Sequence, residues 1–155
     1  MEIIIGSDDI GFALKEDLKA YLTGLGHLIT DMGCESSAVP VDYPDVAVKV
    51  AESIAQGRCD RGILICGTGI GMAIAANKVP GVRAACCHDP YSAERARKSN
   101  NAQIITLGAQ IVAPTLARLL VDRWLQSEFQ GGRSVPKVEK IDAMDSQYRG
   151  KKTSL

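Results

Sequence analysis

The chain has 155 residues, of which 46% are apolar and 23% are charged, a composition typical of a globular domain. Its 18 Lys and Arg residues balance 18 Asp and Glu residues, so charge gives no reason to expect nucleic acid or an anionic membrane as a partner. No apolar run approaches the ~20 residues of a membrane span, and the N-terminus lacks the pattern of a secretion signal.

Short apolar runs alternate with amphipathic segments along the chain. The runs predict strands at residues 2–5, 27–32, 62–65, 82–87 and 103–108. The amphipathic segments predict helices at residues 12–25, 42–57 (after a turn at its start), 70–78, 90–99, 114–125 and 136–148. Strands that alternate with helices predict an α/β fold with a doubly wound, five-stranded parallel sheet and a C-terminal helix.

The first and fourth helices carry more detailed signals. In the first, we expect Lys15, Glu16 and Lys19 to face water. The predicted buried stripe of this helix comprises Phe12, Leu14, Leu18, Tyr21, Leu22 and Leu25. In the fourth, Asp89 is the expected N-cap and Pro90 the first helical residue.

The five cysteines show no Cys-x-x-Cys spacing, so they predict neither a disulfide framework nor a zinc site. A reducing, cytoplasmic setting suits them. Cys86 and Cys87 fall inside a predicted strand and are interpreted as core residues. The length suits one domain at residues 1–148, followed by a polar tail at residues 149–155.

One stretch, residues 62–78, combines a buried strand, a glycine-rich turn and the start of a helix. Cys66 stands where the strand ends, and the turn after it contains Gly67, Gly69 and Gly71. Such a turn can point backbone N–H groups outward, and a helix N-terminus adds positive potential, so the turn can cradle an anion. The same surroundings favour the thiolate form of a cysteine. The turn matches neither a dinucleotide fingerprint nor a P-loop.

These residues also have purely structural explanations. A glycine-rich turn can serve only close packing of helix on strand, and Cys66 can be an inert core cysteine. We favour a working thiol beside an anion or oxyanion cradle, because ligands bind beyond the carboxyl ends of parallel strands. His88 and Gln110 lie at the same edge, although His88 is equally explained as a strand-end polar residue.

Two further pairs of charged residues are candidates. Asp8 and Asp9 follow the first strand, and we expect at least one of them to cap the next helix and the other to bind ligand hydroxyls. Arg133 and Lys137 lie four residues apart around the start of the last helix. They are either a phosphate clamp or part of a solvated face, and spacing alone favours the solvated face.

Taken together, these motifs resemble type-B ribose-5-phosphate isomerase, within the group that includes galactose-6-phosphate isomerase. The most specific match is residues 62–78, and the resemblance covers residues 3 to about 141. The other matching pieces are Gly6-Ser7-Asp8 with Gly11-Phe12 and Leu14-Lys15, Val41-Asp42-Tyr43-Pro44-Asp45, Cys87-His88-Asp89, Asn100-Asn101-Ala102, Leu107-Gly108-Ala109 and Gly131-Gly132-Arg133.

The resemblance implies a Rossmann-like, three-layer α/β/α sandwich that forms a homodimer or a dimer of dimers, with active sites shared between subunits. It implies no cofactor and no metal. The implied reaction interconverts an aldose and a ketose phosphate, of the ribose 5-phosphate/ribulose 5-phosphate type, through a cis-enediolate. Cys66 matches the catalytic base. Thr68 and the amides of the three glycines beside it would stabilise the enediolate oxygens.

The resemblance also implies substrate contacts elsewhere. Asp8 and Tyr43 match contacting positions, and Asn100 matches one contributed by the partner subunit. Gln110 and Lys137 stand where the family often has Arg, whereas Arg133 is kept. We therefore expect a weakened phosphate clamp, since Lys lacks the bidentate fork of Arg.

Two histidines of the family pattern are replaced. Asp9 and Ser99 stand where the family usually has His, and the second of these His residues is credited with opening the furanose ring. This departure favours a tetrose or tetrulose phosphate over a cyclic pentose 5-phosphate, and a free sugar would also fit the weakened phosphate clamp. The alternative is that His88 supplies the missing imidazole.

Two other functional classes stay open. A non-catalytic sugar-phosphate sensor would keep the pocket without needing a reactive thiol. A redox or hydrolytic cysteine enzyme would need a resolving Cys or a His–Asp pair beside Cys66, and the sequence names neither.

Overall fold

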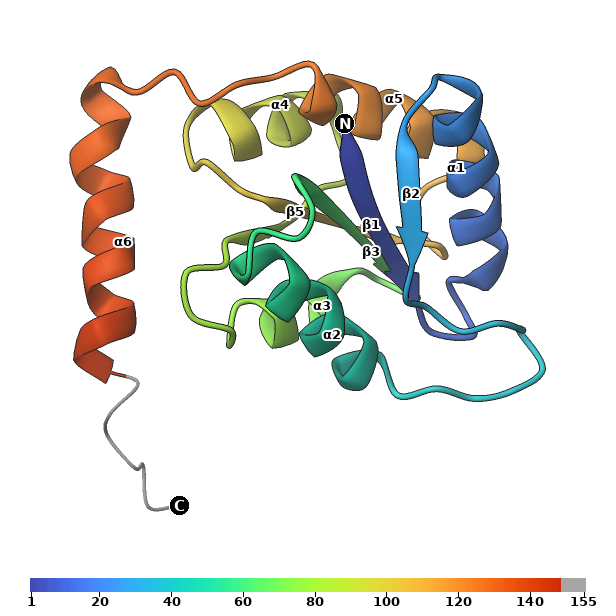
Figure 1. Ribbon diagram of the computed structural model, residues 1–155. Helices are drawn as coiled ribbons and strands as arrows, with labels where there is room; N and C mark the ends of the chain where they lie inside the picture. Colours follow the sequence, from blue (N-terminus) through green and yellow to red (C-terminus); the bar gives the residue numbers. More distant parts are fainter. Residues whose placement is uncertain (149–155) are drawn as a thin grey trace.

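The computed structural model describes residues 1–148, so the predicted tail at residues 149–155 lies outside the described residues. Strands and helices alternate along the described chain (Figure 1). The strands are β1 (Glu2–Ser7), β2 (Leu28–Asp31), β3 (Arg61–Cys66), β4 (Ala84–Cys86) and β5 (Ile104–Gly108). The helices are α1 (Phe12–Gly24), α2 (Tyr43–Ala55), α3 (Ile70–Ala76), α4 (Pro90–Lys98), α5 (Pro114–Leu125), the short 3-10 helix η1 (Gly132–Ser134) and α6 (Val135–Tyr148).

The strands form one parallel sheet in the order β2-β1-β3-β5-β4. β2 lies on one side of β1, whereas β3 and all later strands lie on the other side. The direction of winding therefore reverses between β1 and β3, and this switch point is where an open α/β sheet binds its ligand. The predicted five-stranded parallel sheet is confirmed.

Helices cover both faces of the sheet (Figure 1). Ile63 and Ile65 face a core that includes residues of α1, α4 and α5, with Trp124 fully buried in it. Leu64 and Cys66 face the opposite core, with residues of α2 and α3. This alternation follows from the two-residue period of a strand, and it explains the uninterrupted apolar run of β3. The predicted three-layer sandwich is confirmed.

Helix α6 stands apart from the sandwich, at the end of a connecting segment (Figure 1). It is tied to the loop before β4 by Asp142, whose Oδ1 lies 2.6 Å from Arg83 Nη1, and by Asp145, which accepts the Gly81 N–H at 2.8 Å. Met144 and Tyr148 on this helix are exposed. The helix therefore presents large side chains with apolar surface to the outside of the described chain. No helix within residues 1–148 has the length and apolarity needed to cross a membrane.

The prediction that Lys15 faces water is wrong. Its side chain is only 2% exposed, and Nζ lies 2.7 Å from Asp31 Oδ2. Nζ also donates to the Cys34 carbonyl at 2.8 Å. The end of β2 and the loop after it fold over the first turns of α1 and supply these acceptors. Leu25 was also placed wrongly in the buried stripe, because α1 ends at Gly24 and Leu25 is 56% exposed.

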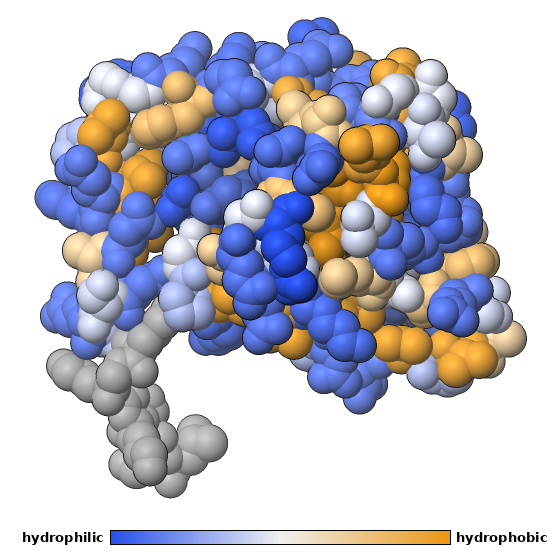
Figure 2. Space-filling view, viewed as in Figure 1, coloured by the Kyte–Doolittle hydropathy of each residue, from blue (hydrophilic) through white to orange (hydrophobic). Residues whose placement is uncertain are grey.

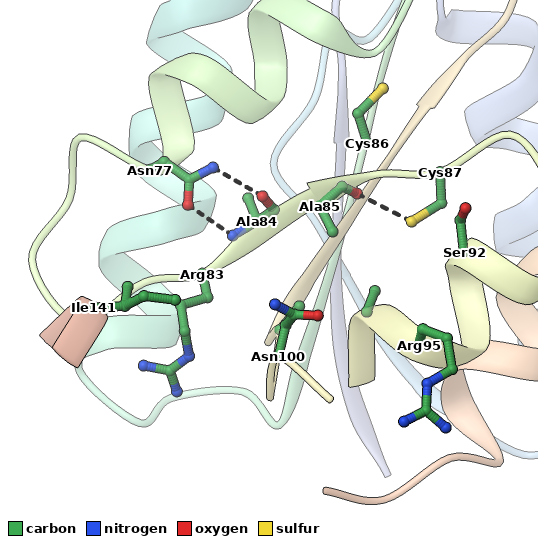
Figure 3. Close-up of a pocket in the computed structure, with 12 residues that line it drawn as sticks. Asn77, Arg83, Ala84, Ala85, Cys86, Cys87, Ser92, Arg95, Asn100 and Ile141 are labelled. Carbon is green, nitrogen blue, oxygen red and sulfur yellow. Dashed lines mark hydrogen bonds between the residues drawn. The ribbon is translucent and has the colours of Figure 1, made fainter. Parts of the chain in front are cut away.

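The fourth strand is shorter than predicted, and Cys86 is not a core residue. Cys86 is exposed whereas Cys87 is buried, and their side chains diverge from the strand (Figure 3). The reason is that β4 is an edge strand, so only one of its two faces is fully covered. Before the strand, the Arg83 N–H bonds the side chain of Gln103 at 2.8 Å instead of a neighbouring strand.

Candidate active site

Cys66 ends β3 at the switch point of the sheet, and its side chain is 5% exposed. Its Sγ accepts the N–H of Gly69 at 3.1 Å. Gly69 has a φ of +76°, and a Cβ added to it would lie 2.8 Å from the carbonyl carbon of Leu107. The turn therefore lies directly on β5 and requires glycine at this position. Helix α3 begins at the next residue.

The thiol lies at the wall of an open cavity of about 490 Å³, called the Cys66 cavity below. Its lining residues come from the segment after β1, from α2, from the end of β3 and the turn after it, from α3 and from the segment after β5. They comprise Asp8, Ile10, Tyr43, Cys66, Gly67, Thr68, Ile70, Gly71, Ile74 and Gln110. Seven of these residues were predicted site residues. The exposed Thr68 side chain accepts the Ile70 N–H at 3.4 Å, which leaves its hydroxyl hydrogen available for donation.

The two adjacent aspartates have different positions. Asp8 is 6% exposed and lines the Cys66 cavity, and its Oδ1 accepts the Gly11 N–H at 2.9 Å. Burial raises the pKa of the Asp8 carboxyl, with a smaller contribution from the charge of Asp9, although the amide hydrogen bond opposes the shift. Asp9 instead accepts the Val41 N–H at 3.2 Å and so holds the loop before α2. The prediction that one of the two aspartates caps α1 is wrong, because the N-cap is Gly11 and no side chain caps the helix. Asp8 is the cavity residue, and Asp9 holds a loop instead.

Tyr43 and Gln110 approach the turn where two glycines leave room. A Cβ on Gly71 would lie 2.5 Å from Tyr43 Cε2, and a Cβ on Gly67 would lie 3.0 Å from Gln110 Oε1. A larger residue at either position would push these side chains away from the cavity. The glycines therefore shape the side walls of the cavity as well as its floor.

Four of the remaining predicted residues, Ser99, Asn100, Arg133 and Lys137, line a second cavity of about 270 Å³, called the cation cavity below. Its lining comprises Arg95, Ser99, Asn100, Arg133, Ser134, Lys137, Val138 and Ile141. It shares no lining residue with the Cys66 cavity. It adjoins a groove of about 450 Å³ between β4, α4 and α6, which is also lined by Arg95 and Asn100 (Figure 3). Within this single chain, the predicted site residues thus lie in two separate cavities.

Ser99 is engaged by a neighbour that the sequence reasoning missed. Its Oγ accepts the Nε–H of Arg95 at 2.9 Å and also an Nη2–H of the same guanidinium. Arg95 lies one helical turn before Ser99, so the spacing allowed this contact, but the sequence alone did not indicate it. Arg133 and Lys137 are exposed, and neither forms an ion pair with another residue of the described chain.

His88 lines neither of these cavities. Its Nε2 accepts the N–H of Gly108 at 3.2 Å, which requires this nitrogen to be unprotonated. Beside it, Thr106 of β5 donates its hydroxyl to the Gly69 carbonyl at 2.7 Å. Nothing in the sequence distinguished Thr106 from other buried strand residues. These contacts lie beneath the turn that follows Cys66.

Comparison with known proteins shows the family of this chain. Residues 3–141 match the ribose/galactose isomerase family. The chain is 51% identical over 149 residues to a D-erythrulose-4-phosphate isomerase of Pectobacterium atrosepticum, covering 96% of this chain and 98% of the relative. It is likewise 51% identical over 149 residues to a ribose-5-P isomerase B of Listeria innocua, covering 96% of this chain and 100% of the relative.

The fold comparison agrees. The solved structure of Clostridium thermocellum ribose-5-phosphate isomerase B has a TM-score of 0.93 and 48% identity to this chain, covering 96% of this chain and 99% of that structure. Sequence and fold therefore match along nearly the same residues. The chain belongs to the ribose/galactose isomerase family, and it is an aldose–ketose isomerase by class.

Proposed function

We propose that this isomerase acts on a short, open-chain sugar phosphate, with Cys66 as the base that moves a proton between C1 and C2. The observation that carries the proposal is the Gly69 N–H, which points at Cys66 Sγ from 3.1 Å at the wall of the Cys66 cavity. A backbone amide directed at sulfur stabilises the thiolate, and the thiolate is the form that can accept a proton.

The reaction moves one hydrogen between adjacent carbons and another between adjacent oxygens. Starting from the aldose, the thiolate takes the C2 proton, which gives a thiol and a cis-enediolate. The thiol returns this proton to C1 while the O2 proton passes to O1, so the ketose forms and the thiolate is restored. The turn amides and the Thr68 hydroxyl supply donors for the negative charge on the enediolate oxygens. Asp8, at the same cavity, supplies an acceptor for a substrate hydroxyl.

A substrate of four carbons with phosphate on O4 fits the residues best. Such a sugar has no free O4–H with which to close a furanose ring, whereas a pentose 5-phosphate closes through O4 and must be opened by proton transfer. The chain has two histidines, His27 and His88, and neither lines the Cys66 cavity or the cation cavity. His88 is bonded to Gly108, and His27 precedes β2 at the opposite edge of the sheet. Ser99, at the ring-opening position, is engaged by Arg95.

The names of the relatives do not choose between the two substrates. One relative is named for erythrulose 4-phosphate and the other for ribose 5-phosphate, and both are 51% identical to this chain. The choice therefore depends on the residues of the two cavities, and it can be tested directly. We expect the kcat/KM for D-erythrose 4-phosphate, measured by ¹H NMR in D₂O, to exceed that for D-ribose 5-phosphate. A preference for ribose 5-phosphate would refute the four-carbon substrate while leaving the isomerase chemistry intact.

We also propose that a second copy of the chain completes each site. The cation cavity would bind the phosphate, because Arg133 and Lys137 have no carboxylate partner among the described residues. In one protomer this cavity is separate from the Cys66 cavity. Ile10, Ile70 and Ile74 at the rim of the Cys66 cavity are exposed, as expected of a surface that a partner covers. Apolar patches also lie among the polar side chains of the face shown in Figure 2.

Mixing two inactive variants tests the shared site. Cys66→Ala and Arg133→Ala should each be nearly inactive as homodimers. After subunit exchange, a mixed dimer holds one site with both native residues and one site with neither. Random mixing should therefore restore about a quarter of the native activity per protomer. If mixing restores no activity although sedimentation shows mixed dimers, each site belongs to a single chain.

A further inference from the structure

The peptide groups on both sides of Gly69 form hydrogen bonds with side chains. The peptide before it carries the N–H that donates to Cys66 Sγ at 3.1 Å. The peptide after it carries the carbonyl that accepts the Thr106 hydroxyl at 2.7 Å and the Ala73 N–H at 3.1 Å. Because glycine can adopt both signs of φ, such contacts, together with the packing of the turn on β5, set the direction of its N–H.

Two side chains from β5 and β4, the last two strands in the sheet order, contact the turn that follows Cys66. Thr106 of β5 is 0% exposed and pairs in register with Cys86 of β4. Cys86 Sγ lies 3.7 Å from the Thr68 carbonyl, which belongs to the same peptide as the Gly69 N–H. The turn therefore lies between Cys66 on one side and a polar layer from β4 and β5 on the other. None of these contacts requires a substrate.

Building on the proposal that Cys66 is the base, we infer that Thr106 is a positioning residue for catalysis: its hydroxyl fixes the Gly69 peptide so that the Gly69 N–H stays directed at the Cys66 sulfur. Cys86 assists through the Thr68 carbonyl. Hydrogen bonds that share a peptide group polarise one another, so the Cys86 contact to the Thr68 carbonyl also strengthens the Gly69 N–H contact to the thiolate. Thr106 contacts the next peptide and acts through the conformation of Gly69.

A merely structural role for Thr106 makes a different prediction. The Gly69 carbonyl keeps the Ala73 N–H as a partner when the Thr106 hydroxyl is removed, so the start of α3 stays satisfied. Thr106→Val keeps the shape of the side chain and should fold, whereas Thr106→Ser keeps the hydroxyl and is the matched control. If the hydroxyl serves stability alone, Thr106→Val lowers Tm without changing the behaviour of Cys66.

The experiment measures both kinetics and thiol reactivity. We expect Thr106→Val to lower kcat about tenfold with little change in KM, since one neutral hydrogen bond is removed far from the phosphate. Alkylation of Cys66 by iodoacetamide, followed over time at one fixed pH, should also become slower. The tryptic peptide Gly62–Lys78 reports this reaction by mass spectrometry, because Cys66 is its only cysteine. Asp8, Tyr43, Cys86 and His88, the titratable groups around Cys66 and its turn, are unchanged in this variant.

Thr106→Ser should restore both kcat and the alkylation rate to near the native values. The inference is refuted if Thr106→Val matches the native protein in kcat and in its alkylation rate while Cys66→Ala is inactive. If Cys66→Ala keeps its activity, the proposed base itself is wrong, whatever Thr106→Val does. The two failures are thus distinguishable.

Discussion

Replacing Gly69 by Ala tests the turn that presents an amide to Cys66. Gly69 has a φ of +76°, and an added Cβ would lie 2.8 Å from the carbonyl carbon of Leu107 and 3.0 Å from its oxygen. The left-handed conformation costs an alanine about 1–2 kcal/mol, and overlap with a backbone that cannot rotate away adds about 1–3 kcal/mol. We expect a loss of roughly 2–5 kcal/mol, which lowers Tm by about 4–20 °C in a domain of this size.

Gly57→Ala is the matched control. Gly57 has a φ of +68°, but an added Cβ would have no atom within 4 Å, so this variant carries only the conformational cost. Circular dichroism should show Gly69→Ala unfolding at a clearly lower temperature than Gly57→Ala. An NMR isomerisation assay at 25 °C should show at least a tenfold loss of kcat for Gly69→Ala alone. Equal Tm values and full activity in both variants would refute the close contact between the turn and β5.

Three further predictions concern charged groups. Burial opposes ionisation of Asp31, but hydrogen bonds from Lys15 and Lys19 outweigh burial and lower the pKa of Asp31. The ionised Asp31 therefore stabilises the folded state fully above pH 3.8, and this stabilisation is lost as the pH falls through the lowered pKa of the folded state. Lys15→Met should therefore cost about 2–3 kcal/mol in urea unfolding at pH 7 and less in acid; an equal loss at both pH values would contradict this. Burial raises the pKa of Asp8, so ionisation of Asp8 destabilises the folded state once the pH rises above 3.8. Asp8→Asn should therefore raise Tm at pH 7 more than at pH 4, while it lowers kcat. A pH-independent difference in Tm would contradict this. Arg133→Ala should raise KM for erythrose 4-phosphate about tenfold or more and leave free erythrose unaffected; equal effects on both sugars would exclude a phosphate contact.

The periodic parts of the fold were predictable from the sequence. Helix α5 was predicted at residues 114–125, and it spans Pro114–Leu125. Asp89 was predicted as an N-cap, and its carboxylate accepts the Ser92 N–H at 2.8 Å. These features depend on local signals, either apolar spacing or capping chemistry, which are complete within a few residues.

The features that sequence reasoning missed depend on contacts between distant segments. Lys15 is buried because Asp31 and the Cys34 carbonyl reach it from another element. Thr106 is distinguished only by the Gly69 carbonyl, 37 positions away in the chain. The glycine turn beside Cys66 was predictable because all its parts are adjacent in sequence.

The proton transfer itself tests the central claim, that Cys66 is the base. Native protein, Cys66→Ala and the control Cys59→Ala would each be incubated with D-erythrose 4-phosphate in D₂O, and both deuterium at the transferred position and ketose formation would be followed by ¹H NMR. Cys59 is a half-buried thiol that precedes β3, at the opposite end of that strand from the Cys66 cavity. We predict native-like turnover for Cys59→Ala and the loss of both product and exchange for Cys66→Ala, with its Tm and oligomeric state unchanged. Turnover and exchange at the native rate in Cys66→Ala would contradict the assignment of Cys66 as the base.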